Sequence, residues 1–600
     1  MRTSLLSSAV LAAVLLAPAV HAQTPAPKRE VRAVWVATVS NLDWPRRGES
    51  ATSQIADLAS LFDGLKAQGI NVIHFQVRTE CDALYASPTE PWSQFLTGTQ
   101  GQDPGYDPLT VAVDLAHKRG MELHAWLNPY RADAAVNTGR DDIAATHVTK
   151  LHPEWVMNIP TLPNKRVLDP GIPAVRAYVT DVVGDIVTRY DVDGIHFDDY
   201  FYPYPEGSFS GMGNEDRSTW ATYGAPSGFT QVTYRGYSVN MMVKGVQARI
   251  NSIRPSVKFG ISPFGIWKSG TPAGVTGMSG ADAIYADGVT WMQQGWLDYL
   301  TPQLYWKFGG GQDYAKLAPW WFTKMTPTVT NVPMPTTARH FYPGLITTTN
   351  QVKEQIAFNR ANGYGGQAIF RAQTLLINPA LHLDTLFRRQ AVPLSMPWKG
   401  DDLAPNAPVA AVPTSAGARI TLSWAKPLPA ADGDTARWYG VYRFPVGIAP
   451  DVSNNRYLVT VVGGGRTQLV DTPPASEGTA FTYAVTAFDE NWNESAMSVP
   501  VVGTDASQGA VPEHSGLMGV GPNPSVRGSD VRVSYALARA GRVEVGVYDV
   551  LGRRVAVLVD EARSAGPHVA VWSSAGVTPG VYVVRFASEE AVASMPLVVR

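Results

Sequence analysis

Short apolar runs alternate with amphipathic segments from residue 30 to about residue 395. The runs have the length of buried strands, and the segments between them repeat apolar positions at the spacing of an α-helix. Strands are expected at 31–37, 70–77, 121–127, 192–198, 257–263, 298–305, 336–345 and 365–371. The clearest expected helices lie at 53–68, 108–119, 173–190, 232–253 and 350–362. Eight strand–helix units in succession predict an α/β fold of the (β/α)8 or TIM-barrel type over residues 30–395.

Polar residues occupy one face of three successive expected strands. Alternate side chains of a strand point to opposite faces, so the apolar set would face the helices and the polar set the barrel interior. The polar set is His74, Gln76 and Arg78, then His124, Trp126 and Asn128, then His196 and Asp198. Barrel interiors usually hold branched apolar residues. This column of polar residues therefore predicts a substrate pocket at the carboxyl ends of the strands.

The segment 193–205 carries the most specific chemistry. Its strand ends in the adjacent carboxylates Asp198 and Asp199, and a loop rich in Tyr and Pro follows. Acid–base cleavage of a glycosidic bond needs carboxyl groups, and sugar rings present apolar faces that stack on aromatic side chains. The pattern predicts sugar-bond cleavage. The structural alternative is that one Asp caps the next helix and the tyrosines only pack.

The loops after the other strands supply further candidates. Glu90 lies between Pro and Trp neighbours, where partial burial would raise its pKa and keep it protonated as an acid; alternatively it is an ordinary surface glutamate. We expect Glu90 to donate the proton and Asp198 to be nucleophile, base or orienter of a substrate acetamide, with Asp199 tuning its charge. The expected substrate-binding residues are Arg78, Asp82, His124, Trp126, Asn128, Tyr130, Arg131, His196, Gln303, Tyr305, Trp306 and Arg371.

Length and charge bound the class of protein. The chain has 600 residues, which suggests about three or four domains. A net charge of −2 with 17% charged residues gives no indication of a nucleic-acid partner. One Cys excludes an internal disulfide, and beyond the amino terminus no run reaches the roughly 18–20 apolar residues of a membrane span.

The amino terminus has a basic start, an apolar run and small residues at Val20-His21-Ala22. This pattern predicts a signal peptide over residues 1–22, cleaved after Ala22. No Cys lies near that site, which argues against a lipoprotein anchor. We expect a soluble, exported protein.

The carboxy-terminal third has a different pattern of apolar and polar residues. Residues 396–405 and 504–516 are expected linkers, and 406–503 alternates at period two, which indicates a β-sandwich. That segment resembles a fibronectin type III module, an immunoglobulin-like sandwich. Residues 517–600 are again all β and carry the phrases Pro522-Asn-Pro524, Val547-Tyr-Asp-Val-Leu-Gly-Arg-Arg-Val555 and Gly580-Val-Tyr582. These phrases resemble the carboxy-terminal sorting domain of type IX secretion. This resemblance implies the type IX machinery as a partner and a location outside the outer membrane of a Gram-negative bacterium, in the medium or at the surface; an immunoglobulin-like module that stays attached is the alternative.

Seven phrases of the expected barrel resemble the bacterial glycosyl-hydrolase-like family 10. They are Arg32-Ala-Val-Trp-Val-Ala37, Phe75-Gln-Val-Arg78, Asp82-Ala-Leu-Tyr85, Glu90-Pro-Trp-Ser93, Leu127-Asn-Pro-Tyr-Arg131, Asp193-Gly-Ile-His-Phe-Asp-Asp-Tyr200 and Thr301-Pro-Gln-Leu-Tyr305. The family is related to enzymes that cleave peptidoglycan glycan strands stripped of their peptides. The resemblance implies glycosidase activity, with Glu90 as an essential acid.

The motif around Asp198 is also similar to the signature of family 18 chitinases, but it departs at two positions. His196 replaces an inner Asp, and Tyr200 stands where the acid Glu of that family would be. The substrate-assisted mechanism of those enzymes therefore cannot be transferred directly, and the acid must come from another strand.

These observations together predict a secreted hydrolase of a polysaccharide, one bearing N-acetylated sugars, without a cofactor or metal. Two alternatives stay open. One is a surface carbohydrate-binding protein that has lost catalysis. The other is a metal-dependent hydrolase with His124, His196 and Asp198 as ligands, which their parity permits.

Overall fold

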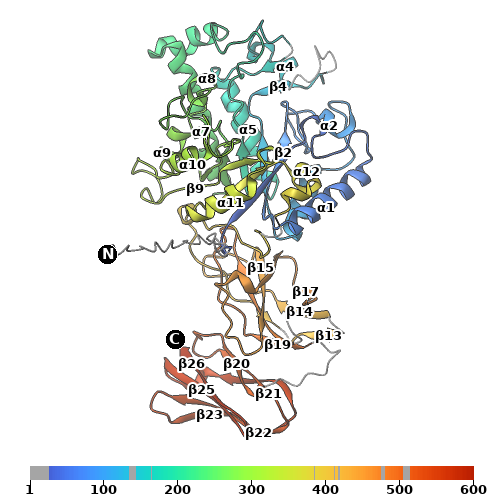
Figure 1. The fold of residues 1–600 in the computed structure, drawn as a ribbon, viewed down its shortest axis with the longest axis vertical. Coiled ribbons are helices and arrows are strands. Elements are labelled where there is room, and N and C mark those ends of the chain that lie inside the picture. Colours follow the sequence, from blue (N-terminus) through green and yellow to red (C-terminus); the bar gives the residue numbers. More distant parts are fainter. Residues whose placement is uncertain are drawn as a thin grey trace, which may run out of the picture.

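The computed structural model describes residues 26–133, 143–163, 165–383, 386–410, 412–416, 419–474, 480–504 and 514–600. The expected signal peptide, most of the second expected linker and part of the insertion after residue 131 lie outside these ranges. The chain forms a large α/β body, a middle β body and a carboxy-terminal β body, arranged along the long axis of the molecule (Figure 1). No helix in the described ranges combines the length and apolar character that crossing a membrane requires.

The α/β body is built on a curled parallel sheet, which in the described residues has nine strands in the order β10-β11-β1-β2-β3-β6-β7-β8-β9. The strands are β1 (Val31–Val36), β2 (Val72–Arg78), β3 (Glu122–Leu127), β6 (Gly194–Phe197), β7 (Lys258–Ile261), β8 (Tyr299–Leu300), β9 (His340–Phe341), β10 (Gly344–Ile346) and β11 (Gly366–Phe370). Only Tyr342 and Pro343 separate β9 from β10, so the order ends beside its own beginning. The arrangement is consistent with the expected barrel.

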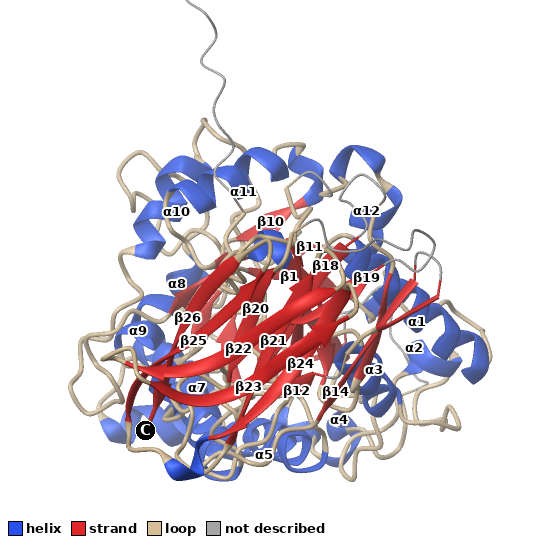
Figure 2. Ribbon diagram, turned by 90° about the horizontal axis from the view of Figure 1, so that it is seen from below, coloured by secondary structure: helices blue, strands red, loops and turns tan. Residues whose placement is uncertain are grey.

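Helices surround this sheet on its outside (Figure 2). They are α1 (Ala51–Ala67), α3 (Pro108–Lys118), α5 (Pro173–Arg189), α7 (Gln231–Ile253), α8 (Gly280–Ala283), α9 (Gly288–Gln293), α10 (Tyr314–Phe322), α11 (Val352–Ala361) and α12 (Ala372–Ile377), with the short α2 (Gln94–Thr97), α4 (Val148–Leu151) and α6 (Arg217–Thr219) in loops. Several begin at side-chain caps, as where Asp107 accepts from the Thr110 N–H at the start of α3. The five helices expected from the sequence are present.

The sixth and seventh strands are shorter than the sequence suggested. The expected strand 298–305 is only β8, which ends two residues before Pro302, a residue without an N–H for a ladder hydrogen bond. The expected strand 336–345 is divided into β9 and β10 at Pro343. Proline explains both differences.

The predicted parity of the strands is confirmed. The outward side chains Ile73, Phe75, Val77, Leu123, Ala125, Leu127, Ile195 and Phe197 belong to the large apolar core beneath the helices. On the inner side the His74 and His196 rings stack with centroids 4.0 Å apart. The Tyr299 hydroxyl joins this stack, 2.8 Å from His124 Nδ1 and 3.0 Å from His196 Nδ1.

The middle body consists, within the described ranges, of two antiparallel sheets around an apolar core. One has the order β12-β14-β13 with β17 beside β14, and the other β16-β15-β18-β19. The strands are β12 (Val409–Ala410), β13 (Thr414–Ala416), β14 (Arg419–Ala425), β15 (Trp438–Pro445), β16 (Leu458–Gly463), β17 (Gln468–Asp471), β18 (Ala480–Phe488) and β19 (Val501–Thr504).

The carboxy-terminal body also consists, in the part of the chain described, of two antiparallel sheets, β20-β21-β24 and β23-β22-β25-β26. Its strands are β20 (Gly516–Gly521), β21 (Asp530–Leu537), β22 (Gly541–Asp549), β23 (Arg554–Arg563), β24 (Gly566–Ser573), β25 (Gly580–Ser588) and β26 (Val592–Val599). A separate apolar core fills the space between these sheets.

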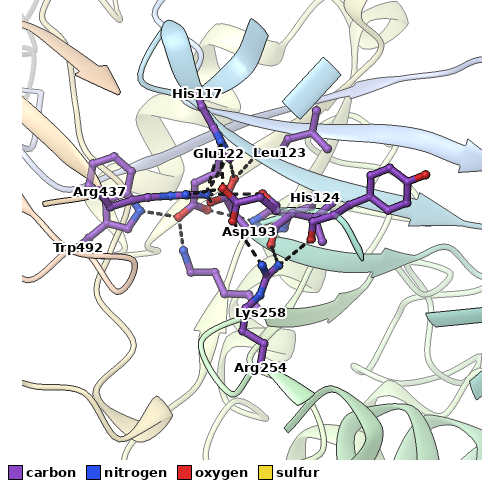
Figure 3. Close-up of polar contacts among 12 residues, drawn as sticks. His117, Glu122, Leu123, His124, Asp193, Arg254, Lys258, Arg437 and Trp492 are labelled. Atoms are coloured by element: carbon purple, nitrogen blue, oxygen red, sulfur yellow. Dashed lines mark hydrogen bonds and ion pairs between the residues drawn. The ribbon is translucent and has the colours of Figure 1, made fainter. Parts of the chain in front are cut away.

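The middle body closes the amino-terminal end of the parallel strands. Glu122, at the start of β3, accepts hydrogen bonds from Lys258 and from the Trp492 indole of the middle body (Figure 3). In the same region Arg437 Nη2 lies 3.2 Å from Asp193 Oδ1. The carboxyl ends of the strands therefore lie at the opposite end of the α/β body, away from both β bodies.

The segment expected as the first linker, 396–405, is packed rather than loose. Trp398 is buried, and its indole donates to Asp298 Oδ1 at 2.8 Å, while Lys399 Nζ donates to Asp298 Oδ2 at 2.9 Å. This connector (residues 396–405) therefore fastens the barrel to the middle body.

Candidate active site

Asp198 and Asn128 follow directly after the paired strands β6 and β3, at the carboxyl end of the sheet. The Asn128 amide donates to Asp198 Oδ2. Its own oxygen accepts from Gln76 Nε2 at 2.7 Å and from Arg131 Nη2 at 2.9 Å. Asn128 is thereby fixed with its N–H group toward the carboxylate, so that residues from β2, from the turn after β3 and from the start of β4 together position Asp198.

Asp198 and Asp199 are almost completely buried, with 4% and 2% of their surface exposed. Burial raises the pKa of Asp198 to about 6, against the opposing effects of Arg131, the Tyr200 N–H, Asn128 and Trp126. Burial and then the charge of Asp198 raise the pKa of Asp199 to about 7. Near neutral pH the pair is therefore poised between one and two negative charges, as acid–base chemistry requires.

Aromatic side chains cover the pair. The Tyr204 hydroxyl donates to Asp199 Oδ2, and the Gln303 side chain also contacts this carboxylate. The Tyr200 and Tyr204 rings meet edge to face at 5.3 Å, and the Arg131 guanidinium lies 5.0 Å from the centre of the Tyr200 ring.

A cavity of about 270 Å³ opens above this cover. One wall is the β4–β5 pair, β4 (Arg131–Asp133) and β5 (Arg166–Val167), and the other is the loop after β6. Its lining residues are Arg131, Asp133, Lys165, Val167, Tyr200, Tyr202, Pro203, Tyr204 and Glu206. Tyr rings and charged side chains in one cavity suit a sugar, which offers apolar faces and hydroxyl groups.

Glu90 lies at the same end of the barrel, and like Asp198 and Asp199 it is not among the residues that line this cavity. Its side chain is fully buried, and Arg78 grips it with Nε at 2.8 Å and Nη2 at 2.7 Å from Oε1. The Tyr178 hydroxyl of α5 donates to the same oxygen. Arg78 Nη1 also donates to the Asn128 carbonyl at 2.6 Å, which connects Glu90 to the residues around Asp198. The arrangement differs from the protonated, unpaired acid expected from the sequence.

Several expected substrate-binding residues lie inside the protein instead. His124 and His196 are buried in the barrel interior, and burial lowers the pKa of His196 well below its ordinary value. Asp82 accepts from the Thr79 hydroxyl at 2.8 Å and from Gln100 Nε2 at 3.2 Å, so it organises its own loop. Tyr130 is fully buried in the core beneath the helices. Strand parity correctly predicts on which side of the strand a side chain lies, but not how deeply that side chain is buried.

The metal alternative also depended on His124, His196 and Asp198. Over the described residues, these three side chains do not form a group whose ligand atoms all lie within 4.8 Å of one another. Their geometry therefore does not provide the ligand set that this alternative needs.

The remaining expected residues lie nearer the site. The negative charge of Asp199 helps raise the pKa of Tyr305, which places that phenol close to the carboxylates. Trp126 is 6% exposed and contributes to the pKa of Asp198. Trp306 packs on Phe264 with ring centroids 5.7 Å apart. Arg371 instead donates to Asp43 Oδ1 at 2.5 Å, in the loop after β1.

Sequence reasoning missed some of the residues that build the site. Lys165 pairs with Glu206 across the cavity, but Lys165 belongs to an insertion without a regular pattern. Tyr178 projects from a helix, where its periodicity indicates only packing. Tyr204 was visible in the Tyr-rich loop, although nothing there distinguished it from its neighbours.

A larger cavity of about 780 Å³ lies at the other end of the barrel, between α3, the end of α5 and the middle body. It contains no side chain from the carboxyl ends of the strands, where (β/α)8 enzymes place their active sites. We therefore assign the candidate active site to the smaller cavity.

Comparisons with known proteins identify relatives of this chain. The chain is 33% identical over 495 residues to "Glycosyl hydrolase YngK" of Bacillus subtilis (strain 168), a match that covers 78% of this chain and 92% of that protein. It is 38% identical over 333 residues to "Glycosyl hydrolase DigH" of Escherichia coli (strain K12), covering 52% and 74%.

Among solved structures, the PgaB (BpsB) glycoside hydrolase domain from Bordetella bronchiseptica matches with a TM-score of 0.38 and 12% identity, covering 60% of this chain and 98% of that one. The family model described as "Glycosyl hydrolase-like 10" matches residues 30–343, which is the barrel up to Pro343. With this match over more than half of the sequence, the chain belongs to the glycosyl hydrolase-like 10 family and is a glycoside hydrolase.

Proposed function

We propose that this protein hydrolyses glycosidic bonds in a polysaccharide that bears N-acetylated sugars, such as peptidoglycan glycan strands. The observation that carries the proposal is the buried pair Asp198 and Asp199, both with raised pKa, beneath a Tyr-lined cavity at the carboxyl end of the barrel. The resemblance of the barrel to enzymes acting on peptide-free peptidoglycan strands supports the substrate class.

In this mechanism the two carboxylates have different roles. Asp199 has the higher pKa, so it holds its proton near neutral pH and donates it to the leaving oxygen. Asp198, which accepts the Asn128 amide and faces the charge of Arg131, is ionised first. Its negative charge stabilises the positive charge that develops on the sugar, or orients a substrate acetamide. Water then adds to the anomeric carbon and gives a proton to the Asp199 carboxylate, which restores the acid.

The family resemblance implies a catalytic role for Glu90. In the present geometry it holds Arg78 in place, and Arg78 in turn donates to the Asn128 carbonyl. On this basis Glu90 acts on Asp198 through its neighbours and Asp199 supplies the proton. In the competing assignment Glu90 is the proton donor, and loss of the catalytic acid would then follow from substitution of Glu90 rather than of Asp199.

The experiment is a digestion panel read by mass spectrometry. The wild-type chain is incubated with purified peptide-free peptidoglycan strands, chitin oligomers and plant glycans. We expect shortened products from the N-acetylated substrates. If the folded wild-type chain instead retains a glycan tightly and releases no product, the protein is a carbohydrate-binding protein.

We further propose that the protein is exported, with 1–22 as its signal peptide, a fibronectin type III module at 406–503 and a type IX sorting domain at 517–600. The sequence patterns of these segments support this assignment. A protein outside the outer membrane cannot reach the peptidoglycan of its own cell, so its substrate would be the wall of another organism or an environmental polysaccharide. Amino-terminal sequencing of the mature chain from culture medium tests the assignment: a start after residue 22 supports it, and a protein found only in the cytoplasm contradicts it.

A further inference from the structure

Three carboxylates converge where the connector meets the middle body. Asp401 belongs to the connector, Asp434 to the loop before β15, and Asp489 to the loop directly after β18. One carboxylate oxygen from each lies within 4.8 Å of the others. Segments that are 33 and 55 residues apart along the chain are thus brought together at one point, and each contributes a negative charge.

Asp489 is the unusual member of this group. Its side chain is completely buried, and Oδ1 accepts the N–H groups of Asn491 at 2.8 Å and Asn493 at 2.9 Å. Its Oδ2 atom is buried without a hydrogen-bond partner. A buried carboxylate oxygen with no partner is costly, because it loses its hydration and gains nothing in exchange. Burial also raises the pKa of Asp489 to about 7, and a cation beside this oxygen would compensate for the lost hydration.

Within the described part of the chain, no ion pair supplies that charge. Among the ion pairs of the described residues, none includes Asp401, Asp434 or Asp489. The exposed acids Asp432 and Glu490 lie next to members of the group in sequence and add to the local negative charge. These carboxylates give the site an excess of negative charge and repel one another. A small cation bound between them would relieve this repulsion.

The donors indicate which cation fits. They are all oxygen atoms, with no Cys or His among them. Carboxylate oxygens suit hard divalent ions, and Ca²⁺ accepts irregular sets of about six to eight oxygens that include carbonyl groups and water. Mg²⁺ demands a near-ideal octahedron and holds its water tightly, so it fits a site of three side chains from separate segments less well.

We propose that Asp401, Asp434 and Asp489 bind one Ca²⁺ ion, which clamps the connector to the middle body. The surrounding contacts show which parts of the molecule the ion would hold together. Asn491 Nδ2 donates to the Asp401 carbonyl at 2.7 Å and to the Met396 carbonyl at 3.2 Å, so the loop after β18 already grips the connector. The next residue, Trp492, donates to Glu122 at the base of the barrel (Figure 3). The ion would stabilise the junction on which the orientation of barrel and middle body depends.

Calorimetric titration of the full chain, freed of metal with a chelator, tests this site. With CaCl₂ as the probe we expect one site per chain, and binding at least about tenfold weaker for MgCl₂. Asp489→Asn and Asp434→Asn should each weaken Ca²⁺ binding at least about tenfold. Asp530→Asn, an exposed carboxylate in the carboxy-terminal body, removes the same charge and should bind as the wild type does.

A thermal melt with and without Ca²⁺ gives a second readout. Saturating Ca²⁺ should raise the melting temperature of the wild type and of Asp530→Asn by about 2–5 °C, and that of the two site variants by much less. Asn keeps the Oδ1 acceptor of residue 489, and Asp434 is only half-buried, so Asp434→Asn decides the matter if Asp489→Asn does not fold. A wild type that shows neither heat nor a shift in melting at several millimolar Ca²⁺ would overturn the proposal, as would site variants that bind as tightly as the control.

Discussion

Replacing Asp199 by Asn should stabilise the protein at alkaline pH, although it removes a residue from the active site. Burial and the neighbouring charge of Asp198 raise the pKa of Asp199 from its ordinary value of 3.8 to about 7. The folded state therefore binds a proton that the unfolded chain releases at lower pH, and stability is lost as the pH rises from about 4 to about 7. Asn does not titrate, so the variant does not suffer this loss.

The magnitude follows from the same values. A rise from 3.8 to about 7, at about 1.4 kcal/mol for each pKa unit, corresponds to about 4 kcal/mol of unfolding free energy above pH 7. Because Asp198 titrates together with Asp199, part of this energy belongs to the pair, and we expect a gain of about 2–4 kcal/mol for Asp199→Asn. Tyr204 can still donate to the Asn oxygen, so the substitution breaks no contact that the structure shows at Oδ2.

The assay is thermal unfolding of the barrel at pH 5 and at pH 8. The variant should melt about 3–6 °C higher than the wild type at pH 8, with a clearly smaller difference at pH 5. Asp114→Asn is the control, because Asp114 is an exposed carboxylate paired only with Lys118 at the surface, and it should show no such pH dependence. The same difference at both pH values, or a variant that is less stable at pH 8, would refute the reasoning.

Other substitutions test neighbouring parts of the site and the junction. Glu90→Gln leaves the buried Arg78 guanidinium without its counter-charge and should lower the unfolding free energy by about 3–5 kcal/mol in chemical denaturation; a variant as stable as the wild type would contradict the ion pair. Tyr204→Phe removes a hydrogen bond that lowers the pKa of Asp199, so the alkaline limb of the kcat/KM profile should move to higher pH, and an unmoved limb would exclude Asp199 as the donor. Trp492→Ala removes a buried indole at the barrel base and should cost about 3–5 kcal/mol, visible in calorimetry as separation of the barrel and middle-body transitions; one unchanged transition would argue against a shared junction.

Much of the fold follows from periodicity, because the spacing of apolar residues reflects which face is buried. Phe75 and Ala125 pack beneath the helices, and His74 and His124 point inward, as alternation along their strands requires. The predicted helices also agree with the observed ones to within a few residues. The observed strands differ from the predicted ones at proline, since Pro343 divides the expected seventh strand.

The site was less predictable, because depth and pairing are properties of the folded protein. His196 on β6 and Asp198 directly after it have the same parity, yet His196 lies in the packed interior while Asp198 lies beneath the tyrosines that line the cavity. The partner of Glu90 is Arg78, twelve residues away, and no local pattern indicates that these two side chains meet. A loop glutamate between Pro and Trp looks the same in sequence whether it is a free acid or half of an ion pair.

The loss of stability expected for Glu90→Gln affects how its activity should be interpreted. From the sequence alone, Gln substitutions at Glu90 and Asn substitutions at Asp198 would abolish cleavage with little effect on melting. The buried ion pair changes that expectation for Glu90, because loss of activity in the variant would no longer distinguish a missing catalytic group from misfolding. Asp199→Asn does not have this difficulty, since it is expected to be at least as stable as the wild type.

The most direct test of the central claim, that the pair Asp198 and Asp199 performs the cleavage, is the kcat of Asp199→Asn on a glycan that the wild type cleaves. Melting temperature is measured on the same samples. We predict a fall in kcat of at least about 100-fold in a fully folded variant, as expected when a general acid is removed. A folded Asp199→Asn chain that cleaves at the wild-type rate would contradict the account.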